Sequence, residues 1–170
     1  MQDGCFMRKC RFIALFIGIM AIAGIPISLS AQPLSRYSEE SKGGKAEAQF
    51  RLGASYVMGQ GVNQSYERAV KWYRKAAHRG HSIAQHNLGI CYAEGVGVAQ
   101  NHCKAAMWFS RSAKSGFALA QYNLAICYYH GTGRPKNISK ATKWLRKAAE
   151  QGHPLAQHDL NILQNTQNKR

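Results

Sequence analysis

The chain has 170 residues, with 23 lysines and arginines against 8 acidic residues and a formal net charge of +15. This length fits one domain with a core of its own. So few acidic residues argue against a catalytic pair of carboxylates. The positive excess suggests an anionic partner or surface, or serves only solubility. It does not come from residues 1–30, which hold three basic residues and one acidic residue.

Residues 1–30 have the pattern of a secretory signal peptide. A basic start around Lys9 precedes an uncharged apolar stretch over residues 12–29, and Ser28 and Ser30 suit a cleavage site. The alternative is an uncleaved membrane anchor, because this stretch approaches the length that spans a bilayer. We therefore expect a periplasmic or secreted protein, or a lumenal one in a eukaryotic secretory pathway. If uncleaved, it would be anchored in the inner membrane and face outward.

Residues 31–44 are polar and rich in Gly and Ser, which predicts a flexible linker. Residues 45–165 then form a repeat domain, followed by a tail over 166–170. Similar segments beginning AQ recur at a spacing of 36 residues, at Ala48, Ala84, Ala120 and Ala156. This gives three repeats, over 48–83, 84–119 and 120–155, and a capping helix over 156–165.

Each repeat has the pattern of two helices. In the first repeat, Ala48, Leu52 and Tyr56 lie on one helical stripe, and a second helix around Trp72 has one broad apolar face. A Gly-x-Gly turn separates them, and Gly80 is placed to end the second helix. We expect Ser65, Asn101 and Asn137 to cap the second helices at their N-termini, and Pro154 to start the capping helix. The fold class is all-α: a short right-handed α-solenoid of antiparallel helix pairs.

The unit A-x-x-x-L-G-x-x-Y-x-x-G-x-G-V, followed by K-A-x-x-W-x-x-K-A-A-x-x-G, closely resembles the Sel1-like repeat, a relative of the tetratricopeptide repeat. The departures are Ser112 in place of an alanine, Ala125 in place of the first glycine, and Arg134-Pro135 in the turn. The resemblance implies an adaptor that assembles other proteins, without catalysis or a cofactor. Bacterial members are often exported.

A partner protein or peptide would bind on the concave side if the first helices line it, as in related solenoids. The inward positions combine aromatic and polar side chains, which suit an extended peptide or a helix. They are Phe50, Val57, Met58, His86, Ala93, Glu94, Tyr122, Tyr129, His130 and His158. The alternative is that some of these side chains pack only between neighbouring first helices.

The second helices carry a basic strip, which we call the basic face: Arg68, Lys71, Lys75, Lys104, Arg111, Lys140, Lys143 and Lys147. A solvated surface would explain it, but an anionic lipid or envelope polymer is the second candidate partner. Nucleic acid is disfavoured, because single-stranded binders combine charge with aromatic rings on one surface. Here the candidate aromatic strip and the cations are expected on opposite faces.

Histidines and cysteines offer little for catalysis. His86 and His158 share one repeat position with Phe50 and Tyr122, which indicates a need for a flat ring, and H-E-x-x-H, C-x-x-C and nucleophile-elbow motifs are missing. We expect no catalytic residue and no metal site; an enzyme or inhibitor acting on cell-wall material is a third hypothesis. Cys91 and Cys103 face each other across the helix pair and are candidates for a disulfide, unless they are small buried residues.

Overall fold

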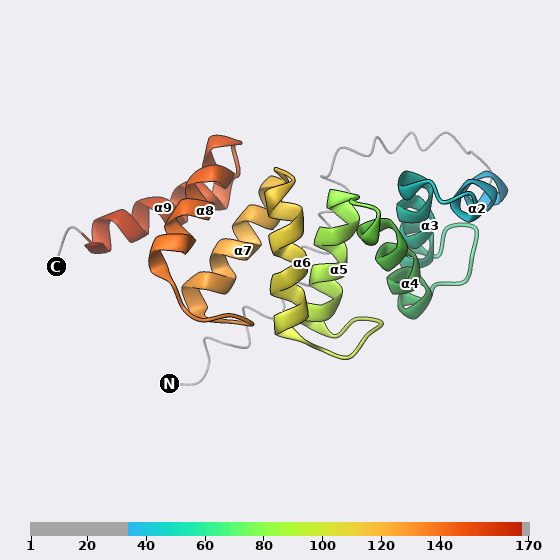
Figure 1. Cartoon of the computed structure of the whole chain (residues 1–170), viewed down its shortest axis with the longest axis horizontal. Coiled ribbons are helices and arrows are strands. Elements are labelled where there is room, and N and C mark those ends of the chain that lie inside the picture. The colour runs from blue at the N-terminus through green and yellow to red at the C-terminus, as the bar shows by residue number, and fades with distance from the viewer. Residues whose placement is uncertain (1–33, 168–170) are drawn as a thin grey trace. The chain divides into compact units, whose positions relative to one another are not determined.

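The structure is a computed structural model that describes residues 34–167 (Figure 1). In this part of the chain eight α-helices follow one another without a strand: α2 (Leu34–Lys42), α3 (Ala46–Met58), α4 (Tyr66–His78), α5 (Ser82–Glu94), α6 (His102–Lys114), α7 (Ala118–His130), α8 (Ile138–Glu150) and α9 (Pro154–Gln167). None of the described helices is both long and apolar enough to span a bilayer. The predicted signal peptide or anchor lies outside the described residues.

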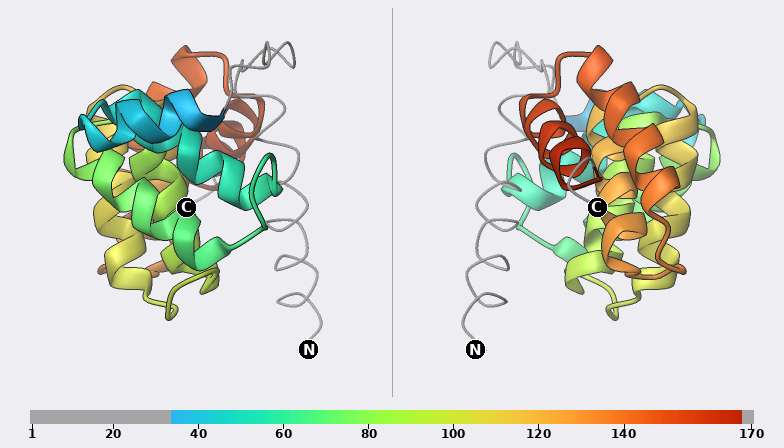
Figure 2. Two further views of the ribbon diagram at one scale, coloured as in Figure 1. Left: turned by 90° about the vertical axis from the view of Figure 1, so that its right-hand side faces the viewer. Right: turned by 90° about the vertical axis from the view of Figure 1, so that its left-hand side faces the viewer.

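The helices form hairpins that stack in chain order. α3 pairs with α4, α5 with α6 and α7 with α8, and each second helix also packs on the first helix of the next pair. The two side views show these hairpins one behind another, ending with α9 (Figure 2). The predicted all-α solenoid of helix pairs with a 36-residue period is therefore confirmed.

The predicted helix ends are also confirmed. The side chains of Ser65, Asn101 and Asn137 each accept a hydrogen bond from the backbone N–H three residues further on. Gly80 and its two counterparts follow the second helices with positive φ. Pro154 is the first residue of α9, which ends at Gln167 and is therefore longer than the predicted cap.

The predicted flexible linker is wrong for residues 34–42, which form α2. Tyr37 and Ser41 on this helix are buried. The side chain of Gln49 in α3 donates a hydrogen bond to the Ser41 carbonyl at 3.2 Å. The corresponding residue of the next repeat, Gln85, donates in the same way to the Ala77 carbonyl at 3.0 Å. Because Ser41 and Ala77 are 36 residues apart, α2 takes the place of the second helix of an incomplete preceding repeat.

Two departures from the repeat pattern have local packing reasons. Gly53 and Gly89 leave room for an aromatic ring of the second helix, since an added Cβ on Gly89 would lie 2.6 Å from the Phe109 ring. In the third repeat the ring is replaced by Leu145, and Ala125 fills the space that the glycine leaves open. Ser112 is fully buried and donates a hydrogen bond to the Ser82 carbonyl at 2.7 Å, which ties α6 to the start of α5.

The second glycine of each Gly-x-Gly turn allows two repeats to approach closely. An added Cβ on Gly97 would collide with the backbone carbonyl of Tyr66, and one on Gly133 with that of His102. Both glycines also have positive φ. The turns of the second and third repeats therefore lie directly on the first turn of the preceding second helix.

Candidate partner-binding surfaces

The predicted concave strip is wrong at Phe50 and His86, which are only 3% and 1% exposed. Both pack between repeats, and we call each contact between one repeat and the next a junction. At each junction the ring contacts the residue that follows the glycine at the end of the second helix of its repeat. The three ring pairs are Phe50 with His81 at 4.7 Å, His86 with Phe117 at 5.1 Å, and Tyr122 with His153 at 4.6 Å between centroids. Phe50, His86 and Tyr122 thus join consecutive repeats, and the buried rings of Phe50 and His86 cannot contact a partner.

His86 is neutral and connects two first helices. Burial lowers its pKa from 6.5 to about 4. Its Nδ1 lies 3.3 Å from Oδ1 of Asn87, and its Nε2 lies 3.0 Å from Nδ2 of Asn123 in α7. A neutral ring that donates from Nδ1 and accepts at Nε2 satisfies both contacts. The side chain is therefore a structural link.

Tyr122 and His158 lie where the third repeat meets the capping helix. The Tyr122 hydroxyl donates to Oδ2 of Asp159 at 3.0 Å, and the Tyr122 ring is half-buried. His158 is exposed, with its Nδ1 3.3 Å from Oδ1 of the same aspartate. Tyr122 is thus mainly engaged within the fold, whereas His158 is accessible to solvent.

The remaining candidates lie at the C-terminal ends of the three first helices. We call them the helix-end strip: Val57, Met58, Ala93, Glu94, Tyr129 and His130. Met58 is 43% exposed and Tyr129 37%, which leaves both side chains accessible to a partner. The Tyr129 and His130 rings meet edge to face at 4.9 Å.

Glutamine side chains from the following turns fix the backbone beneath the helix-end strip. Gln64 donates to the Val57 carbonyl and Gln100 to the Ala93 carbonyl, each at 2.7 Å. These bonds satisfy carbonyls that the ends of the helices leave without an intrahelical partner. The strip therefore stands on a fixed backbone at the ends of α3 and α5, which lowers the entropy lost when a partner binds there.

All eight residues of the basic face are exposed. Six of them lie over a ring of their own repeat: Arg68, Lys104 and Lys140 over Tyr56, Tyr92 and Tyr128, and Lys75, Arg111 and Lys147 over Trp72, Trp108 and Trp144. These rings are scaffold positions outside the predicted concave strip, so they do not bear on the expectation that the strip and the cations lie on opposite faces. Since the cations cover them, they contribute cation–π contacts to the fold.

The predicted disulfide between Cys91 and Cys103 is not formed. Cys91 is buried and Cys103 exposed, and both are free, as is buried Cys127. Cys103 occupies the repeat position of exposed Glu67, so its side chain points away from the core in which Cys91 lies. Burial raises the pKa of Cys91 to about 12 and that of Cys127 to about 11. Within the described residues, histidine, cysteine and acidic side chains do not gather in a group that could hold a metal ion.

Stacked helix pairs with a fixed, partly apolar strip on one set of helix ends define a helical-repeat scaffold. A Sel1 repeat model matches residues 46–81, 82–117 and 118–153, which is more than half of the chain. The chain therefore belongs to the Sel1-repeat family, whose members are typically protein-interaction scaffolds on a non-catalytic fold. The curated proteins with which the chain was compared contain no match.

Solved structures of three bacterial proteins resemble the chain. A Sel1 repeat protein from Oxalobacter formigenes is 36% identical, with a TM-score of 0.72, and the match covers 76% of this chain and 97% of that one. The protective antigen c5321 of uropathogenic Escherichia coli is 35% identical, with a TM-score of 0.68; 71% of this chain aligns with 26% of the antigen. Helicobacter pylori cysteine-rich protein B is 22% identical, with a TM-score of 0.61 and coverage of 75% and 94%, and it shares the fold.

Proposed function

We propose that the protein is an exported adaptor that binds a peptide or a partner protein at the helix-end strip. The observation that carries this proposal is the exposure of Met58 and Tyr129 at equivalent ends of α3 and α7. Large apolar and aromatic side chains held on a fixed backbone are typical anchors of protein interfaces. The family's typical role supports binding, and the signal-like pattern of residues 1–30 supports export.

The test is capture of the native partner from an envelope or secreted fraction by variants of the chain. Met58→Ala and Tyr129→Ala should each weaken capture about tenfold or more, since truncation of an interface anchor costs about 2 kcal/mol. Leu155→Ala is the matched control, because Leu155 is an exposed apolar residue outside the strip. Equal capture by all three variants would rule out the strip as the binding surface.

A second candidate function is binding of an anionic envelope polymer or lipid by the basic face. None of its eight cations forms a salt bridge with an acidic residue in the part of the chain that the structure describes. Binding to anionic vesicles should then fall steeply with salt, and Lys140→Glu with Lys143→Glu and Lys147→Glu should abolish it. Binding that is insensitive to salt would contradict this function.

A further inference from the structure

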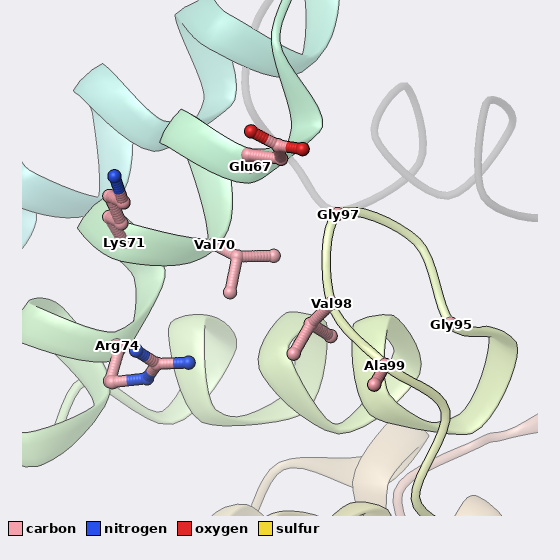
Figure 3. Close-up of a pocket in the computed structure, with 8 residues that line it drawn as sticks. All are labelled: Glu67, Val70, Lys71, Arg74, Gly95, Gly97, Val98 and Ala99. Carbon is pink, nitrogen blue, oxygen red and sulfur yellow. The ribbon is translucent and has the colours of Figure 1, made fainter.

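A cavity of about 500 Å³ lies between α4 and the turn that joins α5 to α6. Glu67, Val70, Lys71 and Arg74 line it from α4, and Gly95, Gly97, Val98 and Ala99 line it from the turn (Figure 3). Its volume is within the range of about 300–1,000 Å³ that is typical of ligand sites. The cavity shares no lining residue with the helix-end strip, although Gly95 directly follows Glu94 of the strip.

The cavity combines an apolar surface with two cations. Val98 and Ala99 supply the accessible apolar part, since Val70 is only 2% exposed, and Lys71 and Arg74 carry the positive charge. Nη2 of Arg74 donates to the Tyr92 hydroxyl at 3.2 Å, which holds the guanidinium in place. Because a guanidinium has five N–H donors, others remain for a ligand. The carboxylate of Glu67 lies at the opposite end of the cavity wall formed by α4 (Figure 3).

The next junction of the same chain shows what happens when this space is closed. The counterpart of Val98 is Arg134, whose Nη2 donates to the Ala106 carbonyl of α6 at 2.7 Å. Its guanidinium also lies over the Tyr128 ring, at 4.6 Å from the centroid. The counterparts of Lys71 and Arg74 on α6 are the uncharged Met107 and Ser110.

The two junctions thus carry their positive charge on different elements. In the second junction the cation comes from the turn, where Arg134 reaches the Ala106 carbonyl beside the uncharged Met107 and Ser110. In the first junction the cations come from the helix, and Val98 leaves the space open. A cationic ligand would be repelled by Lys71 and Arg74, whereas an anionic one would be bound by charge-assisted hydrogen bonds. The chain's own pattern therefore favours an anion joined to a small apolar body.

We propose that this cavity binds a carboxylate-bearing peptide segment, with the carboxylate on Arg74 and Lys71 and an adjacent small apolar side chain against Val98 and Ala99. The carboxylate comes from an acidic side chain or from a chain terminus. A guanidinium forms two parallel hydrogen bonds with a carboxylate, which suits either source. This site does not depend on the helix-end strip.

Three short peptides distinguish the sources in calorimetric titrations of the full chain at low ionic strength. N-acetyl-Glu-Val amide offers an acidic side chain, N-acetyl-Gln-Val with a free terminus offers a terminal carboxylate, and N-acetyl-Gln-Val amide offers neither. We expect saturable binding of at least one carboxylate peptide and none of the neutral peptide. The tighter of the two carboxylate peptides identifies the source.

Variants of the cavity and of its counterpart complete the test. Arg74→Gln should weaken binding about tenfold or more, as loss of a charge-assisted hydrogen bond does. Val98→Arg should abolish binding although it adds a positive charge, because it introduces the side chain that fills the second junction. Lys143→Gln removes the matching charge of Lys71 two repeats later, and should change affinity less than about twofold.

Three outcomes would overturn the proposal: no saturable binding, equal binding of the neutral peptide, or a loss in Lys143→Gln as large as in Arg74→Gln. Circular dichroism of Val98→Arg shows whether its helices persist. If they do not, the binding of the peptides by Arg74→Gln is the test of the proposal. Since none of these variants alters Met58 or Tyr129, failure here is separable from failure of the helix-end strip.

Discussion

Acidification should destabilise the repeat domain through His86. The ordinary pKa of a histidine side chain is 6.5, and burial lowers that of His86 to about 4 in the fold. The unfolded state therefore binds the proton more readily, and the stabilisation is complete above pH 6.5 and is lost as the pH falls toward 4. Each pKa unit corresponds to about 1.4 kcal/mol, so about 3 kcal/mol of the free energy of unfolding should disappear over this interval.

Urea unfolding followed by circular dichroism at a series of pH values measures this loss. His86→Phe should flatten the pH dependence, and a phenylalanine already fills the equivalent position at residue 50. Burial also lowers the pKa of His153, so a smaller slope of the same sign should remain. His158→Gln controls for removal of an exposed imidazole. If His86→Phe and the unaltered chain lose stability in parallel, His86 is not the source of the effect.

Two further predictions concern packing and thiols. Gly89→Ala should destabilise the fold by about 1–3 kcal/mol through contact with the Phe109 ring, and the loss should be much smaller in a Phe109→Leu background; equal losses in urea unfolding would refute this coupling. In the native chain a thiol reagent should modify exposed Cys103 rapidly, whereas Cys91 and Cys127 should react only on unfolding, because burial holds their pKa values near 12 and 11. Rapid modification of all three by mass spectrometry would contradict their burial.

The architecture was predictable because the same residue pattern occurs in three successive repeats. A 36-residue spacing, one stripe of Ala, Leu and Tyr, and glycine at each reversal are enough to define helix pairs that must stack to bury their faces. The N-caps of the second helices were also predictable, because serine and asparagine side chains readily accept a hydrogen bond from the backbone at a helix N-terminus, as Ser65 and Asn101 do.

The helix α2 was not predicted, because its polar composition suggested a linker and its 36-residue spacing from the first repeat was overlooked. Its sequence is polar, and its own helical propensity gives no strong signal. Yet Tyr37, Ser41 and Gly44 lie 36 residues before Tyr73, Ala77 and Gly80. Extending the repeat backwards by one half-unit would have revealed a second helix with a buried ring and a closing glycine.

The candidate groove was only partly predictable, because helical periodicity gives the direction of a side chain along one helix but not its distance from the next repeat. Phe50 and His86 in fact pack against the second helix of their own pair, Phe50 on Tyr73 and His86 on Phe109. The residue after each helix-ending glycine comes back over them and covers them. The predicted disulfide failed for the same reason. Equal distances of Cys91 and Cys103 from the turn do not show whether their side chains point toward each other, and in the structure Cys91 is buried whereas Cys103 is exposed.

The three junctions of this chain vary in complementary ways, and this separates structure from binding. The ring pair changes from Phe–His to His–Phe, so one member compensates for the other. Glycine with an aromatic ring becomes Ala125 with Leu145, which again conserves the filled volume. Val98 is replaced by Arg134 in the next repeat, and a cation lies beside the tyrosine in both repeats, Arg74 beside Tyr92 and Arg134 beside Tyr128. The filled volume is not conserved, because the junction with Val98 retains a cavity. Val98 follows the repeat pattern and Arg134 departs from it. The feature particular to the open junction is therefore the charge of Lys71 and Arg74, and an anionic ligand would account for their place beside the cavity.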